Sequence, residues 1–125
     1  MIRTAALVLS AATMTYMAPS AAFAQDAPPT YQADPSVYKV IFDDQDFRVI
    51  KATWKAGQTD KSHSHPVPSV VYFLTDCSIK LKSPDGKTRD VKNKTGQAGA
   101  VPIEHSHTAT NVTHHACRAL FVERK

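Results

Sequence analysis

The sequence lacks a long apolar run, a Cys-x-x-Cys pair and any segment with clear helical periodicity. It also lacks a run of basic residues interleaved with aromatic ones, so nucleic acid is not expected as a partner. Of its fifteen Lys and Arg, only Arg3 lies near the start, and the other fourteen stand against eleven Asp and Glu. These absences argue against a helical bundle, a membrane-spanning chain and a nucleic-acid binder. The informative features that remain are the strand patterns and the histidines.

Residues 1–24 have the organisation of a secretory signal peptide. Arg3 provides a positive start, residues 5–12 form an apolar run interrupted only by Ser10, and Ala22-Phe-Ala24 offers a small-x-small cleavage site. The run is too short for a spanning helix, and without a twin arginine the general secretory route is favoured. An uncleaved anchor and a disordered tail are the less favoured alternatives. The mature protein is therefore expected to be periplasmic or secreted.

After this segment, residues 25–36 are rich in Pro, Ala, Asp and Gln, which predicts a flexible leader. Residues 37–125 are enough for one domain with a modest core. Alternating or β-branched patterns predict strands, and Pro84-Asp85-Gly86 predicts a hairpin turn. The predicted strands are 37–42, 47–55, 70–74, 77–82, 88–92, 100–103, 107–113 and 118–122. Eight or nine short strands without a helix indicate an all-β sandwich or barrel.

Two of these patterns make further predictions. Residues 70–74 are apolar on both faces, as in a buried central strand, with Val71 and Phe73 facing the interior and Tyr72 and Trp54 also in the core. Six basic residues cluster around the predicted hairpin and are expected to form a solvated face: Lys80, Lys82, Lys87, Arg89, Lys92 and Lys94.

Cys77 and Cys117 are the two cysteines, and an oxidising compartment favours a disulfide between them. Cys77 follows one predicted strand and Cys117 precedes another, so the sulfurs meet if those strands pair antiparallel. The bridge would close a loop of about forty residues, worth roughly 3–4 kcal/mol in the chain-entropy model. The alternative is that one cysteine is a metal ligand or a redox thiol.

The histidines carry the strongest functional signal. His63 and His65 are separated by one residue, so in an extended strand both side chains point to the same face. A third histidine, His107, lies in a later strand, and each group follows a glycine in a frame of small residues. Two imidazoles on one face, met by a third from a distant strand, make most of a metal site.

These frames resemble the two motifs of the cupin family. The first motif reads Gly57, five residues, His63-Ser-His65, and then Ser69 or Val70 where the family has a glutamate. The second reads Gly96, five residues, Pro102, four residues, His107, three residues and Asn111, with Glu104 in place of a glycine. The glycine that closes the first motif is also missing, since residues 76 and 77 are Asp and Cys.

The resemblance implies a small jelly-roll barrel that holds one divalent metal ion. It implies His63, His65 and His107 as ligands, with water completing the shell, because a serine hydroxyl at Ser69 is a poor ligand at neutral pH. Additional ligands or outer hydrogen-bond partners are expected among Ser69, His105, Glu104 and Asn111. By strand alternation, His105 should share the face of His107. Asn111 more often holds a strand turn in this family, and His114 and His115 are expected to be exposed loop residues.

Nitrogen ligands favour Zn, Cu or Ni over Fe by affinity, but they do not fix the metal. A metal with an open position suits an oxygenase, a hydrolase or a lyase that acts on a small molecule. The missing glutamate and the small size instead suit a non-catalytic periplasmic protein that binds a metal or small ligand, and a metal-free scaffold is a third reading. Pairing of two copies through their sheets, as a homodimer, stays open.

Overall fold

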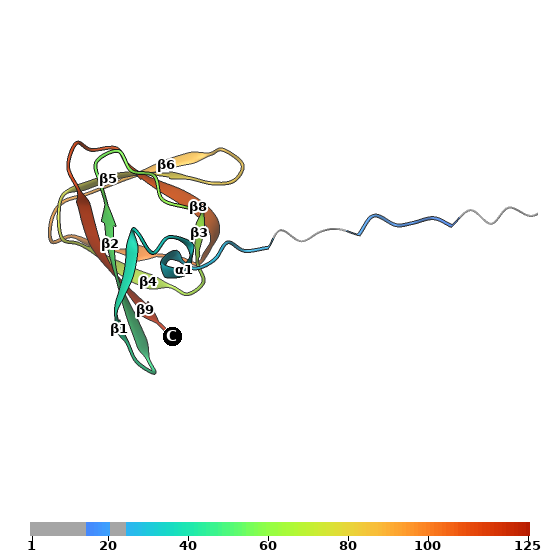
Figure 1. The fold of residues 1–125 in the computed structure, drawn as a ribbon, viewed down its shortest axis with the longest axis horizontal. Coiled ribbons are helices and arrows are strands. Elements are labelled where there is room, and N and C mark those ends of the chain that lie inside the picture. Colours follow the sequence, from blue (N-terminus) through green and yellow to red (C-terminus); the bar gives the residue numbers. More distant parts are fainter. Residues whose placement is uncertain (1–14, 21–24) are drawn as a thin grey trace, which may run out of the picture.

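The computed structural model describes residues 15–20 and 25–125 (Figure 1). The predicted signal peptide falls mostly on residues 1–14 and 21–24, which lie outside the described part of the chain. Within the described part, no helix is long and apolar enough to cross a membrane.

Nearly all of the regular structure is β-strand, which confirms the predicted fold class. One short helix, α1 (Thr30–Ala33), precedes the strands. The strands are β1 (Tyr38–Asp43), β2 (Phe47–Trp54), β3 (His63–His65), β4 (Ser69–Phe73), β5 (Cys77–Lys82), β6 (Thr88–Asn93), β7 (Ala98–Val101), β8 (Glu104–Asn111) and β9 (Cys117–Arg124). Residues 83–87 form the predicted hairpin turn between β5 and β6, and Gly86 there has a positive φ of 86°.

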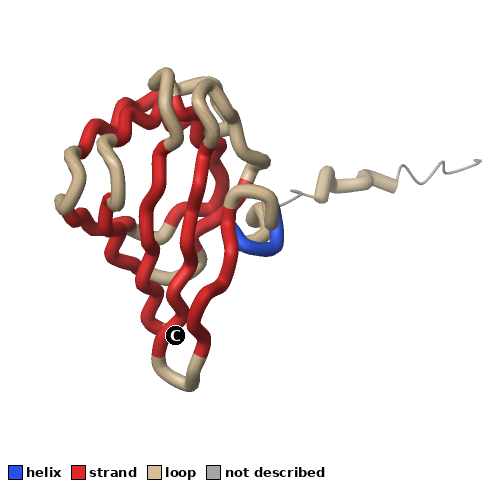
Figure 2. The backbone as a smooth tube through the Cα atoms, turned by 60° about the vertical axis from the view of Figure 1, so that its left-hand side comes forward, coloured by secondary structure: helices blue, strands red, loops and turns tan. Residues whose placement is uncertain are grey.

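The strands form two antiparallel sheets that lie face to face as a jelly-roll barrel (Figures 1 and 2). One has the order β1-β2-β9-β4-β7 and the other the order β3-β8-β5-β6. The core lies between them, because alternate residues of each strand point inward. The larger sheet contributes Ile50, Trp54 and Phe121 to the core, and the smaller one contributes Ile79 and Ala109.

Strand β4 differs from the prediction on one face. Val71 and Phe73 are buried as expected, but Val70 is 51% exposed and Tyr72 is 43% exposed, so the expectation that Tyr72 belongs to the core is wrong. Strand β4 lies between β9 and β7, yet no second layer from residues 15–20 or 25–125 covers the outer face of its sheet. Cross-strand pairing instead places an apolar row on that face: Phe42, Val49, Val122, Val70 and Ala100. The six basic residues near the β5–β6 hairpin are exposed, as predicted.

The leader at residues 25–36 is folded against the barrel, contrary to the predicted flexible segment. The backbone N–H of Ser64 donates to the Pro28 carbonyl (2.9 Å), and that of Ala27 donates to the His105 carbonyl (3.0 Å). Thr30 and Asp34 are buried. Strand β3 is an edge strand, and its free backbone groups give this polar segment partners that its composition does not reveal.

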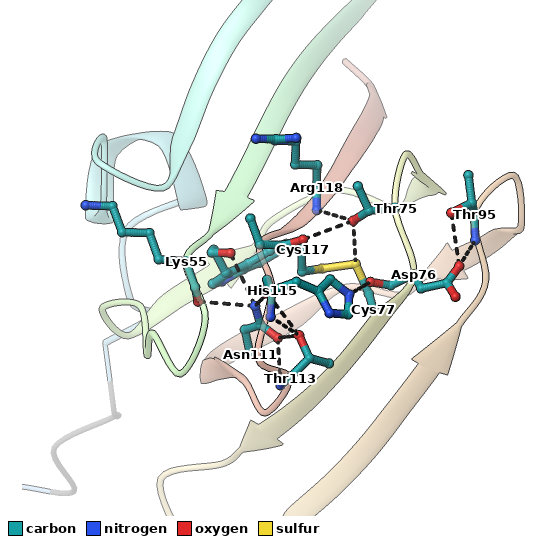
Figure 3. Close-up of a disulfide and its surroundings, with 12 residues drawn as sticks. Lys55, Thr75, Asp76, Cys77, Thr95, Asn111, Thr113, His115, Cys117 and Arg118 are labelled. Atoms are coloured by element: carbon teal, nitrogen blue, oxygen red, sulfur yellow. Dashed lines mark hydrogen bonds between the residues drawn. A yellow bond between two sulfur atoms is a disulfide. The ribbon is translucent and has the colours of Figure 1, made fainter.

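The predicted disulfide is present between Cys77 and Cys117, with the two Cα atoms 5.2 Å apart (Figure 3). Cys77 begins β5 in one sheet, and Cys117 begins β9 in the other. The bridge therefore joins the two layers of the barrel. Because both cysteines are in this bridge, neither is a metal ligand or a redox thiol in the oxidised protein.

Candidate metal centre

The three motif histidines meet where β3 pairs with β8. His63 lies opposite His107, and a register shift then places His65 opposite Glu104. Two residues of β8, His105 and Ser106, therefore stand where one residue of β3 stands, which is a β-bulge. Gly57 and Gly96, which open the two motifs, have φ values of 72° and 84° and form the turns expected of them.

His63, His65 and His107 are all buried, and they offer three ring nitrogens within 4.8 Å of one another. The ring centroids of His63 and His107 are 4.6 Å apart, and those of His65 and His107 are 5.1 Å apart. His65 also stacks on Phe121 at 5.7 Å. The predicted convergence of the three rings is therefore present, and the cluster could hold a metal ion.

Hydrogen bonds orient two of these rings. The Nδ1 of His63 lies 2.9 Å from the Lys61 carbonyl, which only accepts, and the Nδ1 of His107 contacts the Glu104 carboxylate. Both rings thus carry their proton on Nδ1, so Nε2 is free to bind a cation. Glu104 is held in turn by Arg89, whose guanidinium donates to it at 2.7 Å. Carboxylate–histidine pairs of this kind commonly orient metal ligands.

Burial favours the neutral form of two of the rings, those of His63 and His65. Burial lowers the pKa of His65 to about 3, with the neighbouring His63 and His107 adding to the effect. Burial likewise lowers the pKa of His63, although Asp60 opposes the change. Burial raises the pKa of Glu104, but Arg89 and His107 outweigh it and hold that pKa below its usual value. The site therefore combines neutral nitrogen donors with an ionised carboxylate just behind them, which suits a divalent cation.

A cavity of about 100 Å³ adjoins the three rings. Its polar lining comes from the histidines, Tyr38, Arg89 and Glu104, whereas most of the wall is apolar, including Val71, Phe73, Ile79, Leu81, Val91, Val101 and Phe121. A neighbouring pocket of about 200 Å³ shares Leu81, Arg89, Glu104 and His107 with this cavity. A bound ion would thus face a small, largely apolar chamber.

Ser69 is not brought to the histidines. Its side chain points inward and is buried, but it does not line the cavity, and its hydroxyl has no hydrogen-bond partner in the described part of the chain. It lies opposite the buried Glu123, which faces Arg48 at 3.7 Å. The prediction of Ser69 as an additional ligand is therefore not supported by its position.

His105 and Asn111 also have roles outside the cluster. The bulge in β8 turns His105 outward, where its exposed ring pairs with Asp26 at 2.9 Å, so the expectation that it shares the face of His107 is wrong. The Asn111 side chain donates to the carbonyls of Trp54, Lys55 and His115 and holds the strand turn, as expected. His114 and His115 are exposed, also as expected.

Asp60 and Tyr38 are site residues that the sequence motifs do not reveal. Asp60 lies in the variable part of the first motif, buried, with Oδ2 3.6 Å from the Nδ1 of His63. Tyr38 comes from β1, and its hydroxyl is 3.5 Å from the Nε2 of His63. Asp60 thus places a carboxylate near the His63 ring, and Glu104 places one at the His107 ring. The three histidines that could bind the ion are not accompanied by a carboxylate ligand.

The shifted histidine pKa values predict a pH effect on stability. An unfolded His65 takes up a proton near its ordinary pKa of 6.5, whereas the folded one does so only near 3. Between these values the unfolded state binds more protons, so the free energy of unfolding of the metal-free protein should fall as the pH drops, by about 1.4 kcal/mol per unit. Denaturant titrations at pH 6 and pH 5 measure this slope. His65→Gln should reduce it and His105→Gln should not; an equal slope in both variants would contradict the prediction.

Structural comparison places this site in a known fold. A cupin domain from Bordetella pertussis superposes with a TM-score of 0.66 at 19% identity, covering 82% of this chain and 99% of that one. A cupin with a double-stranded β-helix fold from Methanocaldococcus jannaschii gives a TM-score of 0.57 at 12% identity, covering 70% and 78%. This chain therefore has the cupin fold, as its motifs indicate.

Oxalate decarboxylase is also similar, with a TM-score of 0.55 at 19% identity, but the shared region is 71% of this chain and only 26% of that enzyme. No family model matches the sequence, and no curated protein matches it. At these identities the likeness establishes the fold, and the function has to be argued from the site itself.

Proposed function

We propose that this protein is an exported, mononuclear metal-binding cupin that acts on a small molecule, as a metal-dependent oxygenase or a related enzyme. The observation that carries the proposal is the convergence of three buried imidazoles beside a small apolar cavity. His63, His65 and His107 would hold the ion through nitrogen. Three imidazole nitrogens favour Zn, Cu or Ni over Fe by affinity, and iron remains a candidate because metal supply also decides occupancy.

A bound ion of this kind would supply Lewis acidity, or redox chemistry if it is copper or iron. The protein's own residues would orient and enclose the reaction. Glu104 and the Lys61 carbonyl fix two ring tautomers, while Val71, Phe73 and Phe121 keep the chamber apolar. At about 100 Å³, the chamber has space for several waters or a ligand of a few heavy atoms, so the substrate class is small.

Metal analysis of the protein matured in its own export compartment tests the proposal. The wild-type protein should carry about one divalent ion per chain, and His107→Ala should carry much less. Absence of any transition metal from the native protein, together with failure to bind Zn²⁺, Cu²⁺, Ni²⁺ and Fe²⁺ added afterwards, would favour the metal-free scaffold and reject this function.

A non-catalytic periplasmic binder is the second candidate, favoured by the small volume of the cavity. Oxygen uptake by the metal-loaded protein can separate the two, with small diketones, thiols and phenols as substrates. Turnover with any of them supports the enzyme. No oxygen uptake and no product with any of the four metals, together with a site that exchanges no water, would favour the binder.

Glu104 should matter for metal binding although it is not expected to touch the ion. Glu104→Gln keeps the side-chain shape but weakens the contact that orients His107, so zinc affinity should fall by roughly 10–100-fold. Competition with a chromophoric chelator measures this loss. Asp26→Asn is the matched control, because it alters the carboxylate that pairs with the exposed His105. Equal zinc affinities of Glu104→Gln and the wild type would show that this contact has no role in binding.

Export is supported by the signal-peptide pattern of residues 1–24 and by the disulfide, which oxidising compartments favour.

The homodimer stays a prediction. The apolar row on the outer face of the larger sheet is the surface where pairing would be tested, by comparing the mass in solution of the wild type and Val70→Lys.

A further inference from the structure

Tyr38 is fixed beside the histidine cluster. It is the first residue of β1 and is buried, and its backbone N–H donates to the Asp34 carbonyl of the folded leader at 3.0 Å. Its ring packs edge-on against Trp54 at 5.5 Å and against His63 at 5.2 Å. The hydroxyl therefore reaches the cavity from the side of the larger sheet, across from the strands that carry the histidines.

The Tyr38 hydroxyl donates its proton to Asp60 and not to His63. The Tyr38 oxygen lies 2.6 Å from Oδ2 of Asp60, and a carboxylate can only accept. Asp60 is held in place by the Trp54 indole N–H at 3.0 Å and by the Ala109 backbone N–H at 2.7 Å. The hydroxyl thus donates to Asp60 and turns its lone pairs away from that carboxylate.

Nε2 of His63, which contacts the Tyr38 oxygen, carries no proton either. The Nδ1 of His63 donates to the Lys61 carbonyl, so Nε2 of the neutral ring is an acceptor, and it lies 3.5 Å from the Tyr38 oxygen. Two lone-pair donors thus face each other in a buried place with no hydrogen between them. Nε2 of His63 therefore lacks a hydrogen-bond donor in the described part of the chain, and a cation bound to this nitrogen and to the Tyr38 oxygen would satisfy it.

We propose that the hydroxyl oxygen of Tyr38 is a fourth protein donor to the ion held by His63, His65 and His107. Unlike the Ser69 hydroxyl, it donates its proton to a carboxylate at 2.6 Å, which makes its oxygen a better electron donor. This inference rests on the proposed metal-binding function and adds a ligand that neither sequence motif contains. The proposal also assigns a role to Asp60. By accepting the hydroxyl proton, Asp60 sets the direction of the Tyr38 lone pairs. The metal ligands would then come from both sheets. The remaining open coordination position would face the apolar chamber.

Zinc affinity and water access test this role together. Tyr38→Phe removes only the oxygen, so the dissociation constant for Zn²⁺ should rise at least about tenfold. Tyr72→Phe is the matched control, because it makes the same chemical change at the exposed face of the larger sheet and should leave the affinity unchanged. In the Cu²⁺-loaded protein, broadening of the electron paramagnetic resonance lines by ¹⁷O-water should increase in Tyr38→Phe, since water takes the vacated position.

The outcomes separate the two proposals. If the wild type binds neither zinc nor copper, and also neither nickel nor iron, the metal-binding function itself fails. If the wild type binds zinc through its histidines, but Tyr38→Phe has the same affinity and the same water broadening, only the role of Tyr38 is overturned. If Tyr38→Phe does not fold, a crystal structure of the zinc-loaded wild type decides: an oxygen–zinc distance of about 2 Å supports the role, and one beyond about 3 Å rejects it.

Discussion

His107→Ala is expected to weaken zinc binding by more than about a hundredfold, beyond the loss expected for a residue that only orients a ligand. It removes one of three ring nitrogens that lie within 4.8 Å of one another. Glu104 keeps its ion pair with Arg89 in this variant, so the metal-free barrel should still fold. Zinc competition titrations measure the affinity. Thermal unfolding with and without zinc provides a second measurement, because an ion that binds only the native state raises its stability.

His105→Ala is the control for this experiment. His105 lies two residues away in the same strand, yet its side chain is exposed and pairs with Asp26 outside the cluster. Zinc affinity and the zinc-dependent rise in melting temperature should therefore match the wild type. A similar loss in both variants would mean that the effect comes from β8 as a whole, and it would remove the support for His107 as a ligand.

The sequence predicted the clustered histidines because the side-chain alternation of a strand is local. His63 and His65 needed only an extended backbone to share a face, and the glycine turns at Gly57 and Gly96 set where each histidine strand begins. The burial of Val71 and Phe73 followed from the same alternation. Predictions of this kind depend on neighbouring residues alone, so a single sequence is enough for them.

The remaining site residues depend on pairing between distant segments. His105 was expected beside His107, but the bulge opposite β3 shifts the register and brings Glu104 to the ring instead. Nothing in residues 104–107 alone indicates that extra residue. Tyr38 and Asp60 are 22 positions apart and meet only when the start of β1 lies against His63 in the first histidine strand. The leader resembles a disordered segment by composition, and it is ordered by the free edge of β3.

The disulfide is placed to stabilise the barrel without shaping it. Cys77 and Cys117 join segments that other bonds also hold together (Figure 3). The Arg118 backbone N–H donates to the Thr75 hydroxyl at 2.9 Å, and the His115 ring is 2.9 Å from the Asp76 carbonyl. With these contacts in place, the native arrangement should persist after reduction. The main effect of the bridge should therefore lie in the unfolded chain, where it restricts a loop of 40 residues.

Reduction of the wild-type protein should therefore lower the free energy of unfolding by about 3–4 kcal/mol, a large share of the 5–15 kcal/mol typical of a domain. Denaturant unfolding of the oxidised and reduced forms gives this difference while leaving both sulfurs in the core. The double variant Cys77→Ala/Cys117→Ala should unfold at a lower midpoint than the oxidised wild type, and reductant should not move that midpoint. Zinc affinity should stay close to the wild-type value in all three samples, because the bridge does not line the histidine cavity.

A stability loss below about 1 kcal/mol on reduction would mean that the unfolded chain is already compact around this loop. A loss of zinc affinity on reduction would instead show that the bridge holds the two sheets in the register on which the metal site depends.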